Sequence, residues 1–131
     1  MADSVLVVDD ETDFLKTYER LLQRRGYQVV AVSTRREGLV VVQSRPLRLV
    51  VADVKLPDGD GLDIVRAARV AAPPPAVIVV TGFASDANRR QALEAGATAY
   101  LPKPFSVSSF TELVDRLATP PPGREHPGGT A

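Results

Sequence analysis

Residues 47–53 read LRLVVAD, a short apolar run that ends at an acidic residue. Runs of the same kind, rich in valine and bounded by polar or turn residues, recur along the chain at Val5–Val8, Val29–Val32, Ala76–Val80 and Thr98–Leu101. Such runs are typical of strands that are buried on both faces. The sequence therefore predicts five strands, with Leu47–Ala52 as the third.

Segments with helical periodicity lie between and after these runs. Thr34 and Glu37 have the spacing of a capping box, which predicts a helix start. The helix expected over 86–95 is mostly alanine and polar residues, so it has little to bury and should be the loosest element. Two other helices carry a clear apolar stripe, formed by Phe14, Tyr18, Leu21 and Leu22 in the first and by Phe110, Leu113, Val114 and Leu117 in the last.

Strand and helix alternate five times. This order predicts an α/β fold, a (βα)5 doubly wound five-stranded parallel sheet, and residues 1–118 are enough for one such domain. Residues 119–131, TPPPGREHPGGTA, change abruptly to proline and glycine, and we expect a flexible tail or linker there.

The composition excludes several classes of function. Sixteen Lys and Arg balance 16 Asp and Glu, and the basic pairs 24–25, 35–36 and 89–90 fall on different elements, so we expect no direct nucleic-acid binding. The absence of cysteine excludes disulfides and thiolate metal sites, and the single histidine, His126, lies in the expected tail. No apolar run approaches a membrane span and no secretory signal is visible, so a cytoplasmic location without membrane contact is expected.

Reactive side chains follow the predicted strand ends. The carboxyl ends of parallel strands meet at one edge of an open sheet, which is where such folds carry their chemistry. Converging carboxylates repel one another, and a hard cation such as Mg²⁺ relieves that repulsion. Alone, each residue has an ordinary interpretation as a helix cap, turn former or surface charge. Together they predict one site at this edge of the sheet, with a magnesium ion held by Asp9, Asp10 and Asp53 and with Thr81 and Lys103 beside it.

The same set suits phosphoryl transfer. Asp53 is the candidate nucleophile, Lys103 would contact a phosphoryl oxygen as a point charge, and Thr81 would donate a hydrogen bond to another. No glycine-rich loop follows the first strand, so a nucleotide cofactor is not expected.

Four blocks of this sequence resemble the receiver domain of two-component response regulators: VLVVDDE (5–11), VVADVKLPDGDGLDIV (50–65), VIVVTG (77–82) and AYLPKPF (99–105). With their connecting helices they cover residues 4–118. The resemblance implies a flavodoxin-like receiver fold with strand order 2-1-3-4-5.

The resemblance also implies site roles. Asp53 would be the phosphoacceptor, and Asp9, Asp10, Asp53 and the backbone carbonyl of Lys55 would hold Mg²⁺. Thr81 and Lys103 would bind the phosphoryl group, the latter before a cis Pro104 peptide bond.

Two further positions concern switching and lifetime. Tyr100 would be an aromatic switch that swings inward with Thr81. Phe83 and Lys55 stand where relatives set the phosphoryl lifetime, and we expect them to hinder the attacking water. Pro57 and Gly61 match a tight turn after Asp53, whereas Ala99 departs from a frequently acidic position.

As a receiver, the chain would be a signalling domain that catalyses only its own phosphorylation and dephosphorylation. Its partners would be a sensor histidine kinase or phosphotransfer protein, and a second copy bound through the face of helix 86–95, strand 98–101 and the last helix. Two alternatives stay open: an interaction module that takes no phosphate, and a Mg-dependent phosphohydrolase. A phosphohydrolase of this kind would need a second acidic residue two positions after Asp53, where Lys55 stands. It would also need additional residues to form a substrate cap.

Overall fold

The structure, a computed structural model, describes residues 3–118, so the predicted tail at 119–131 lies outside the described residues. Its centre is a five-stranded, wholly parallel sheet with the order β2-β1-β3-β6-β7. Because β6 and β7 are the fourth and fifth long strands, this confirms the predicted order 2-1-3-4-5. The strands are β1 (Ser4–Val8), β2 (Gln28–Val32), β3 (Leu49–Asp53), β6 (Ala76–Thr81) and β7 (Ala99–Pro102).

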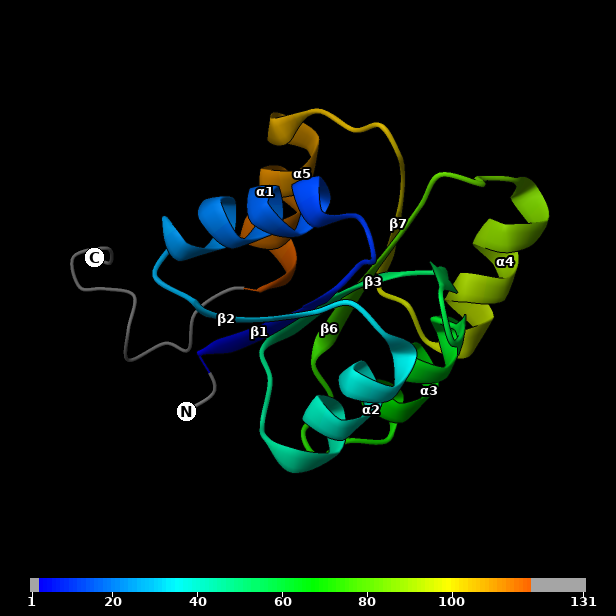
Figure 1. Ribbon diagram of the computed structural model, residues 1–131, viewed down its shortest axis with the longest axis horizontal. Helices are drawn as coiled ribbons and strands as arrows, with labels where there is room; N and C mark the ends of the chain where they lie inside the picture. The colour runs from blue at the N-terminus through cyan, green and yellow to red at the C-terminus, as the bar shows by residue number, and fades with distance from the viewer. Residues whose placement is uncertain (1–2, 119–131) are drawn as a thin grey trace.

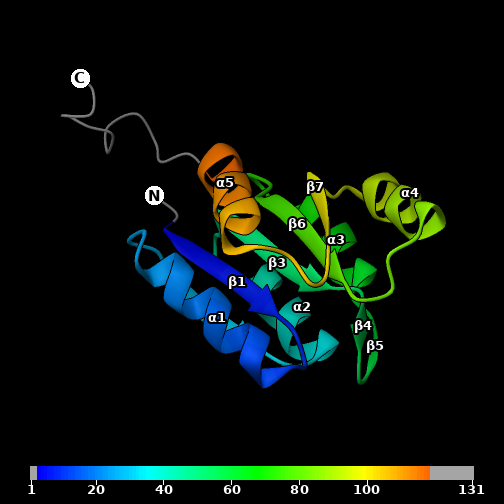
Figure 2. The same ribbon diagram turned by 90° about the horizontal axis from the view of Figure 1, so that it is seen from above.

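Five helices cover the two faces of the sheet. Helices α1 (Thr12–Gln23) and α5 (Val107–Leu117) lie on one face, and α2 (Arg35–Ser44), α3 (Leu62–Arg69) and α4 (Asp86–Ala95) on the other (Figures 1 and 2). Each face has its own core. Phe110 and Tyr18 dominate the first, whereas aliphatic side chains and alanines fill the second. No helix within residues 3–118 is long and apolar enough to cross a membrane.

The edge strands correct one expectation. The central strands β1, β3 and β6 are almost completely buried, as predicted. In β2 and β7, however, most residues are only half-buried, so burial on both faces is wrong for these two strands. An edge strand has a hydrogen-bonded neighbour on one side only, and solvent reaches its side chains around the other.

Capping residues mark several of the helix boundaries. Thr34 caps α2 by accepting a hydrogen bond from the Glu37 amide, as the capping box predicted. Gly26 and Gly96 follow α1 and α4 with φ of +89° and +121°, the region that favours glycine.

A short hairpin between β3 and α3 was not predicted. Strands β4 (Lys55–Leu56) and β5 (Gly59–Asp60) pair antiparallel where the sequence indicated only a tight turn. At its tip, both carboxylate oxygens of Asp58 accept hydrogen bonds from the amides of Arg35 (2.7 Å) and Arg36 (2.9 Å). These amides at the start of α2 have no partner inside the helix, so the hairpin completes the helix cap from a distance.

Gly61 ends the hairpin in contact with the backbone of β3. Its amide donates to the Val54 carbonyl at 2.7 Å. A Cβ atom at this position would lie 1.8 Å from the carbonyl oxygen of Asp53, so only glycine fits. The start of α3 is thereby held directly against the end of β3.

Candidate functional site

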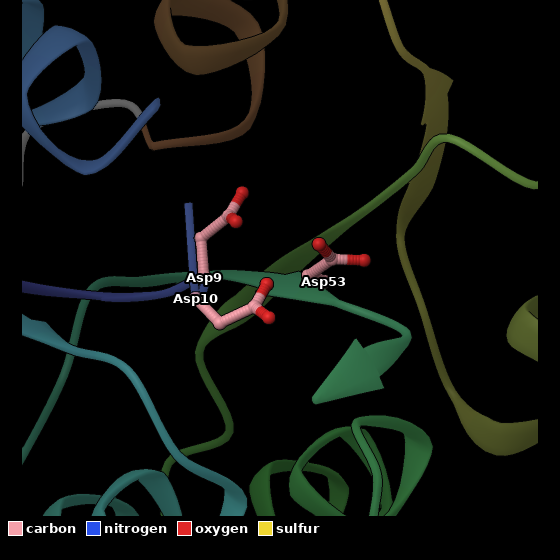
Figure 3. Close-up of side chains that lie close together, drawn as sticks. All are labelled: Asp9, Asp10 and Asp53. Atoms are coloured by element: carbon pink, nitrogen blue, oxygen red, sulfur yellow. The ribbon is translucent and has the colours of Figure 1, made fainter. Parts of the chain in front are cut away.

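Three carboxylates meet at the carboxyl edge of the sheet. Asp9 and Asp10 follow β1 directly, and Asp53 is the last residue of β3. The β1–β3 register pairs Val8 with Ala52, so the next residue of each strand lies at the same level. Each side chain offers one oxygen within 4.8 Å of the others (Figure 3). Asp9 and Asp53 are buried, while Asp10 is exposed to solvent.

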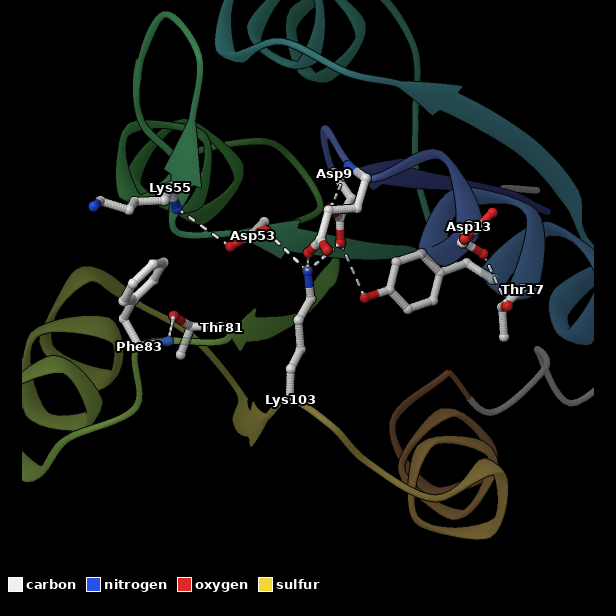
Figure 4. Close-up of polar contacts among 10 residues, drawn as sticks. Asp9, Asp13, Thr17, Asp53, Lys55, Thr81, Phe83 and Lys103 are labelled. Atoms are coloured by element: carbon white, nitrogen blue, oxygen red, sulfur yellow. Dashed lines mark hydrogen bonds and ion pairs between the residues drawn. The ribbon is translucent and has the colours of Figure 1, made fainter.

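Lys103 joins this cluster from the segment after β7. Its Nζ lies 2.8 Å from Asp9 Oδ2, 2.8 Å from Glu11 Oε1 and 3.0 Å from Asp53 Oδ2 (Figure 4). The Lys103 side chain is 6% exposed, so its pairs with the buried Asp9 and Asp53 are largely shielded from water, whereas the Glu11 side chain is 57% exposed. The Lys103–Pro104 peptide bond is cis, as expected. The structure therefore brings Lys103 together with the predicted acidic residues.

Burial is the largest influence on the ionisation of Lys103 and Asp53. It acts to lower the pKa of Lys103, but hydrogen bonds to Asp9, Glu11 and Asp53 outweigh it and raise that pKa well above its usual value. Burial also raises the pKa of Asp53, although the hydrogen bond from Lys103 acts to lower it. Lys103 thus stays a cation, whereas the negative form of Asp53 is disfavoured by its surroundings.

The donor set fits a hard divalent cation. Three carboxylates, those of Asp9, Glu11 and Asp53, pair with the single ammonium of Lys103, and the carboxylate of Asp10 lies beside those of Asp9 and Asp53. The cluster offers carboxylate oxygens only, which is the chemistry that Mg²⁺ prefers. Next to it, the Lys55 amide donates to Asp53 Oδ1 at 3.2 Å, which places the Lys55 backbone at the rim of the cluster.

Thr81 lies at the end of β6 with 1% of its surface exposed. Its Oγ1 accepts a hydrogen bond from the Phe83 amide at 3.0 Å. The adjacent β3 and β6 are parallel, so Thr81 reaches the same edge of the sheet as Asp53 (Figure 4). The hydroxyl is therefore near the cluster but engaged with its own loop.

Phe83 and Lys55 form a contact that the sequence did not predict. The Lys55 Nζ lies 4.4 Å from the centroid of the Phe83 ring, within the range of a cation–π interaction. The ring is 63% exposed. The two predicted lifetime positions thus touch each other across the rim, and they join the hairpin to the β6–α4 loop.

Tyr100 lies on β7 and is half-buried. Its hydroxyl oxygen accepts a hydrogen bond from the Ser85 amide at 3.4 Å. Ser85 is the cap of α4, accepting in turn from the Asn88 amide. The ring of Tyr100 is therefore connected to the start of α4, and no contact between it and the acidic cluster is found among residues 3–118.

Two residues of the site were not predicted to belong to it. Glu11 was visible after the first strand, but nothing in the pattern indicated its ion pair with Lys103. Tyr18 was predicted as part of an apolar stripe, yet its hydroxyl donates to Asp9 Oδ2 at 3.4 Å. Burial, and then the charge of Asp9, raise the pKa of Tyr18 far above its usual value, so the phenol remains a donor. A polar tip on a buried stripe residue is the signal that could have indicated this contact.

A family model described as response regulator receiver domain matches residues 5–115. The chain is also similar to the photosynthetic apparatus regulatory protein RegA of Cereibacter sphaeroides, with 35% identity over 125 residues. That match covers 95% of this chain and 68% of the relative, and against RegA of Rhodovulum sulfidophilum the share of the relative is 66%. The chain thus spans about two thirds of the length of these regulators.

Two solved structures are similar throughout the fold. One is a response regulator protein from Burkholderia pseudomallei with a phosphorylated aspartic acid, a calcium ion and citrate. It has a TM-score of 0.77 and 32% identity over 89% of this chain and 67% of that one. The other is the beryllofluoride-activated NtrC4 receiver domain dimer, with a TM-score of 0.81 and 33% identity over 88% of this chain and 96% of that one.

Proposed function

This chain belongs to the response regulator receiver domain family of two-component systems, and from that premise we propose that it is switched by phosphorylation of Asp53. One observation carries the proposal: a buried carboxylate at a strand end lies against the Lys103 ammonium and two further carboxylates. A histidine kinase or phosphotransfer protein would supply the phosphoryl group. The Asp53 oxygen forms a new bond to phosphorus while the bond from phosphorus to the donor nitrogen breaks, leaving an acyl phosphate.

Asp9, Asp10 and Asp53, with the Lys55 carbonyl, would hold Mg²⁺. When bound, the ion supplies positive charge that neutralises the phosphoryl oxygens. The similar protein from Burkholderia pseudomallei holds both a phosphorylated aspartic acid and a calcium ion, which supports a divalent cation in this type of site.

Lys103 and Thr81 would bind the phosphoryl group. Lys103 turns from its carboxylate partners to a phosphoryl oxygen, because a dianionic group attracts the ammonium more strongly than a shared carboxylate. The Thr81 hydroxyl donates to another oxygen, and this draws the β6–α4 loop towards Asp53 through its bond with the Phe83 amide. The domain therefore catalyses its own modification and needs no further active site.

The output surface would be the face of α4, β7 and α5. Movement of the β6–α4 loop displaces Ser85, which releases the Tyr100 hydroxyl and allows the ring to swing inward. The similar NtrC4 receiver has a dimeric structure, which supports dimerisation, and the face of α4, β7 and α5 is the surface that we propose for it. The domain would act in the cytoplasm, with no direct contact to nucleic acid or membrane.

Two other functions are weaker. An interaction module that takes no phosphate would have no use for the buried ion pair between Lys103 and Asp53. A phosphohydrolase needs a second acidic residue two positions after the nucleophile, but Lys55 stands there and points its ammonium at Phe83.

The test is mass spectrometry of the intact protein after incubation with Mg²⁺ and acetyl phosphate. We expect a gain of one phosphoryl group that is lost in Asp53→Asn and in EDTA. Asp115→Asn, an aspartate on α5 away from the cluster, is the matched control and should be modified like the wild type. A folded wild type that gains no mass would favour the interaction module.

A further inference from the structure

Tyr18 is a buried polar side chain for which the proposed mechanism has no role. It lies on the face of α1 that packs against the sheet, and its side chain is completely buried. Its hydroxyl nevertheless reaches Asp9 Oδ2. A phenylalanine would fill the same apolar space, so packing alone does not explain why this residue carries a hydroxyl.

The ring of Tyr18 is held by a cluster of aromatic neighbours. Ring centroids of Phe14, Phe105 and Phe110 lie 6.1, 6.1 and 5.3 Å from that of Tyr18. A ring packed on several sides has little freedom to turn away. The hydroxyl is therefore a fixed donor at the base of the acidic cluster.

Asp9 has donors on both carboxylate oxygens. The Glu11 amide donates to Oδ1 at 2.9 Å, which fixes one end of the group. At Oδ2 the donors are the Lys103 ammonium at 2.8 Å and the Tyr18 hydroxyl at 3.4 Å. In this state Lys103 is the stronger partner, because it is charged and closer.

The balance changes when the phosphoryl group is present. Lys103 then turns to a phosphoryl oxygen and leaves Asp9 Oδ2. Among the residues that the structure describes, Tyr18 is the remaining side chain with a hydrogen bond to that oxygen. Without it, Asp9 would be held at Oδ1 alone and could rotate out of line with Asp10 and Asp53.

We propose that Tyr18 is a positioning residue, which keeps Asp9 directed at the metal site after Lys103 has moved to the phosphoryl group. The proposal rests on the proposed function. Groups that orient a metal ligand through a hydrogen bond affect metal affinity without touching the metal. The competing explanation is that Tyr18 is an ordinary core residue. Its hydroxyl would then donate to Asp9 only because that carboxylate is the nearest acceptor, with no effect on metal binding.

The test compares wild type with Tyr18→Phe, which keeps the ring in the core and removes only the hydroxyl. Mg²⁺ affinity is measured from the rise of the urea unfolding midpoint with Mg²⁺ concentration, since a ligand that binds the folded state stabilises it. Each protein is titrated with Mg²⁺ alone and with Mg²⁺ plus beryllofluoride, a phosphoryl analogue that would engage Lys103. Tyr27→Phe is the matched control, because its hydroxyl donates to the Ala118 carbonyl away from the cluster.

With beryllofluoride, we expect Tyr18→Phe to weaken Mg²⁺ binding by about tenfold, the lower end of the effect of such groups. With Mg²⁺ alone the change should be much smaller, because Lys103 still holds Asp9. Tyr27→Phe should match the wild type in both titrations.

Equal Mg²⁺ affinity of Tyr18→Phe and wild type in beryllofluoride would overturn the role of Tyr18 while leaving the proposed function intact. An equal loss in both titrations would also overturn it, because the departure of Lys103 would then have no part. If beryllofluoride adds no Mg²⁺-dependent stability to the wild type itself, the proposed function fails and this inference fails with it.

Discussion

Helices α5 and α4 both adjoin the segment around β7, but they are attached to the domain in different ways (Figure 2). Helix α5 buries the aromatic ring of Phe110 and the side chain of Val114. Helix α4 buries only the alanines Ala92 and Ala95. A buried phenylalanine removes far more apolar surface from water than an alanine, so α5 is anchored much more strongly.

Polar contacts reinforce this difference. Near the end of α5, Asp115 pairs with Arg25 at 2.6 and 3.0 Å and the Ala118 carbonyl accepts from Tyr27 at 2.5 Å. The polar contacts of α4 lie mostly at its start, where Ser85 caps it and Asn88 bonds the Phe83 carbonyl. We therefore call α5 the fixed side of the domain. Helix α4 and the loop before it, which carries Phe83, form the responsive side, where we expect movement to cost less free energy.

The largest expected effect is on the fixed side. Phe110→Ala should lower the free energy of unfolding by about 3–5 kcal/mol, because it removes a fully buried ring and leaves a cavity. Leu93→Ala on α4 should cost less than about 1 kcal/mol, since that side chain is 39% exposed. Urea unfolding measures both. Similar losses in the two variants would break the comparison.

Hydrogen exchange tests the same contrast without substitution. Backbone amides of α4 should exchange at least about tenfold faster than those of α5, because a helix with few buried side chains opens locally at lower cost. Native-state exchange followed by mass spectrometry of peptic peptides resolves the two helices. Equal protection would show that α4 is as firmly attached as α5.

Features of the fold that depend on neighbouring residues in the sequence could be predicted well. Valine-rich runs and capping residues act locally, and they predicted the five strands and the start of α2, whereas the order of the strands in the sheet came from the family resemblance. The clustering of Asp9, Asp10, Asp53 and Lys103 followed from a rule about parallel sheets, and the structure brings them together.

The features that could not be predicted are contacts made by the ends of side chains between residues that are distant in the sequence. Helical period places Tyr18 on a buried stripe, but it does not say that the hydroxyl meets Asp9. The contact between Lys55 and Phe83 joins two loops whose separation no local pattern encodes. The half-burial of β2 and β7 required knowing which strands are the edges before applying the burial rule.

On the responsive side, Phe83→Ser should shorten the lifetime of the proposed aspartyl phosphate by a few-fold. We expect the exposed ring and the Lys55 side chain that packs on it to hinder the approach of water to Asp53, and a serine would remove the ring and leave Lys55 without this contact. The decay of the phosphorylated mass after removal of the donor gives the rate. Val107→Ser, which removes an exposed apolar side chain on α5, is the control and should decay like the wild type. An unchanged rate in Phe83→Ser would contradict the role of the ring.

The smallest expected effect sharpens the description of the fixed side. The hydrogen bonds from Arg25 lower the pKa of Asp115, so the pair contributes stability when the carboxylate is charged and loses it as the pH falls through that lowered pKa. At neutral pH, Asp115→Asn should cost about 0.2–1 kcal/mol, the usual value for an exposed pair.

At a pH below the lowered pKa of Asp115, the difference between wild type and Asp115→Asn should vanish, since the carboxyl of the wild type is then protonated in both the folded and unfolded states. Urea unfolding across the pH range measures this. In an Arg25→Gln background the substitution should have little effect at any pH, which isolates the pair. A constant difference down to acid pH would assign the effect to something other than charge.

The close approach of Gly61 to the Asp53 carbonyl has a consequence for protein engineering. The segment from Asp53 to Gly61 is joined to β3 at one end, to the start of α2 through Asp58 in the middle and to α3 at the other end. A designer who wishes to move this site into another scaffold has to transplant the segment whole, together with the first turn of α2. Insertions for sensors or tags belong elsewhere in the chain, because extra residues here would displace the carboxylate of Asp53 itself.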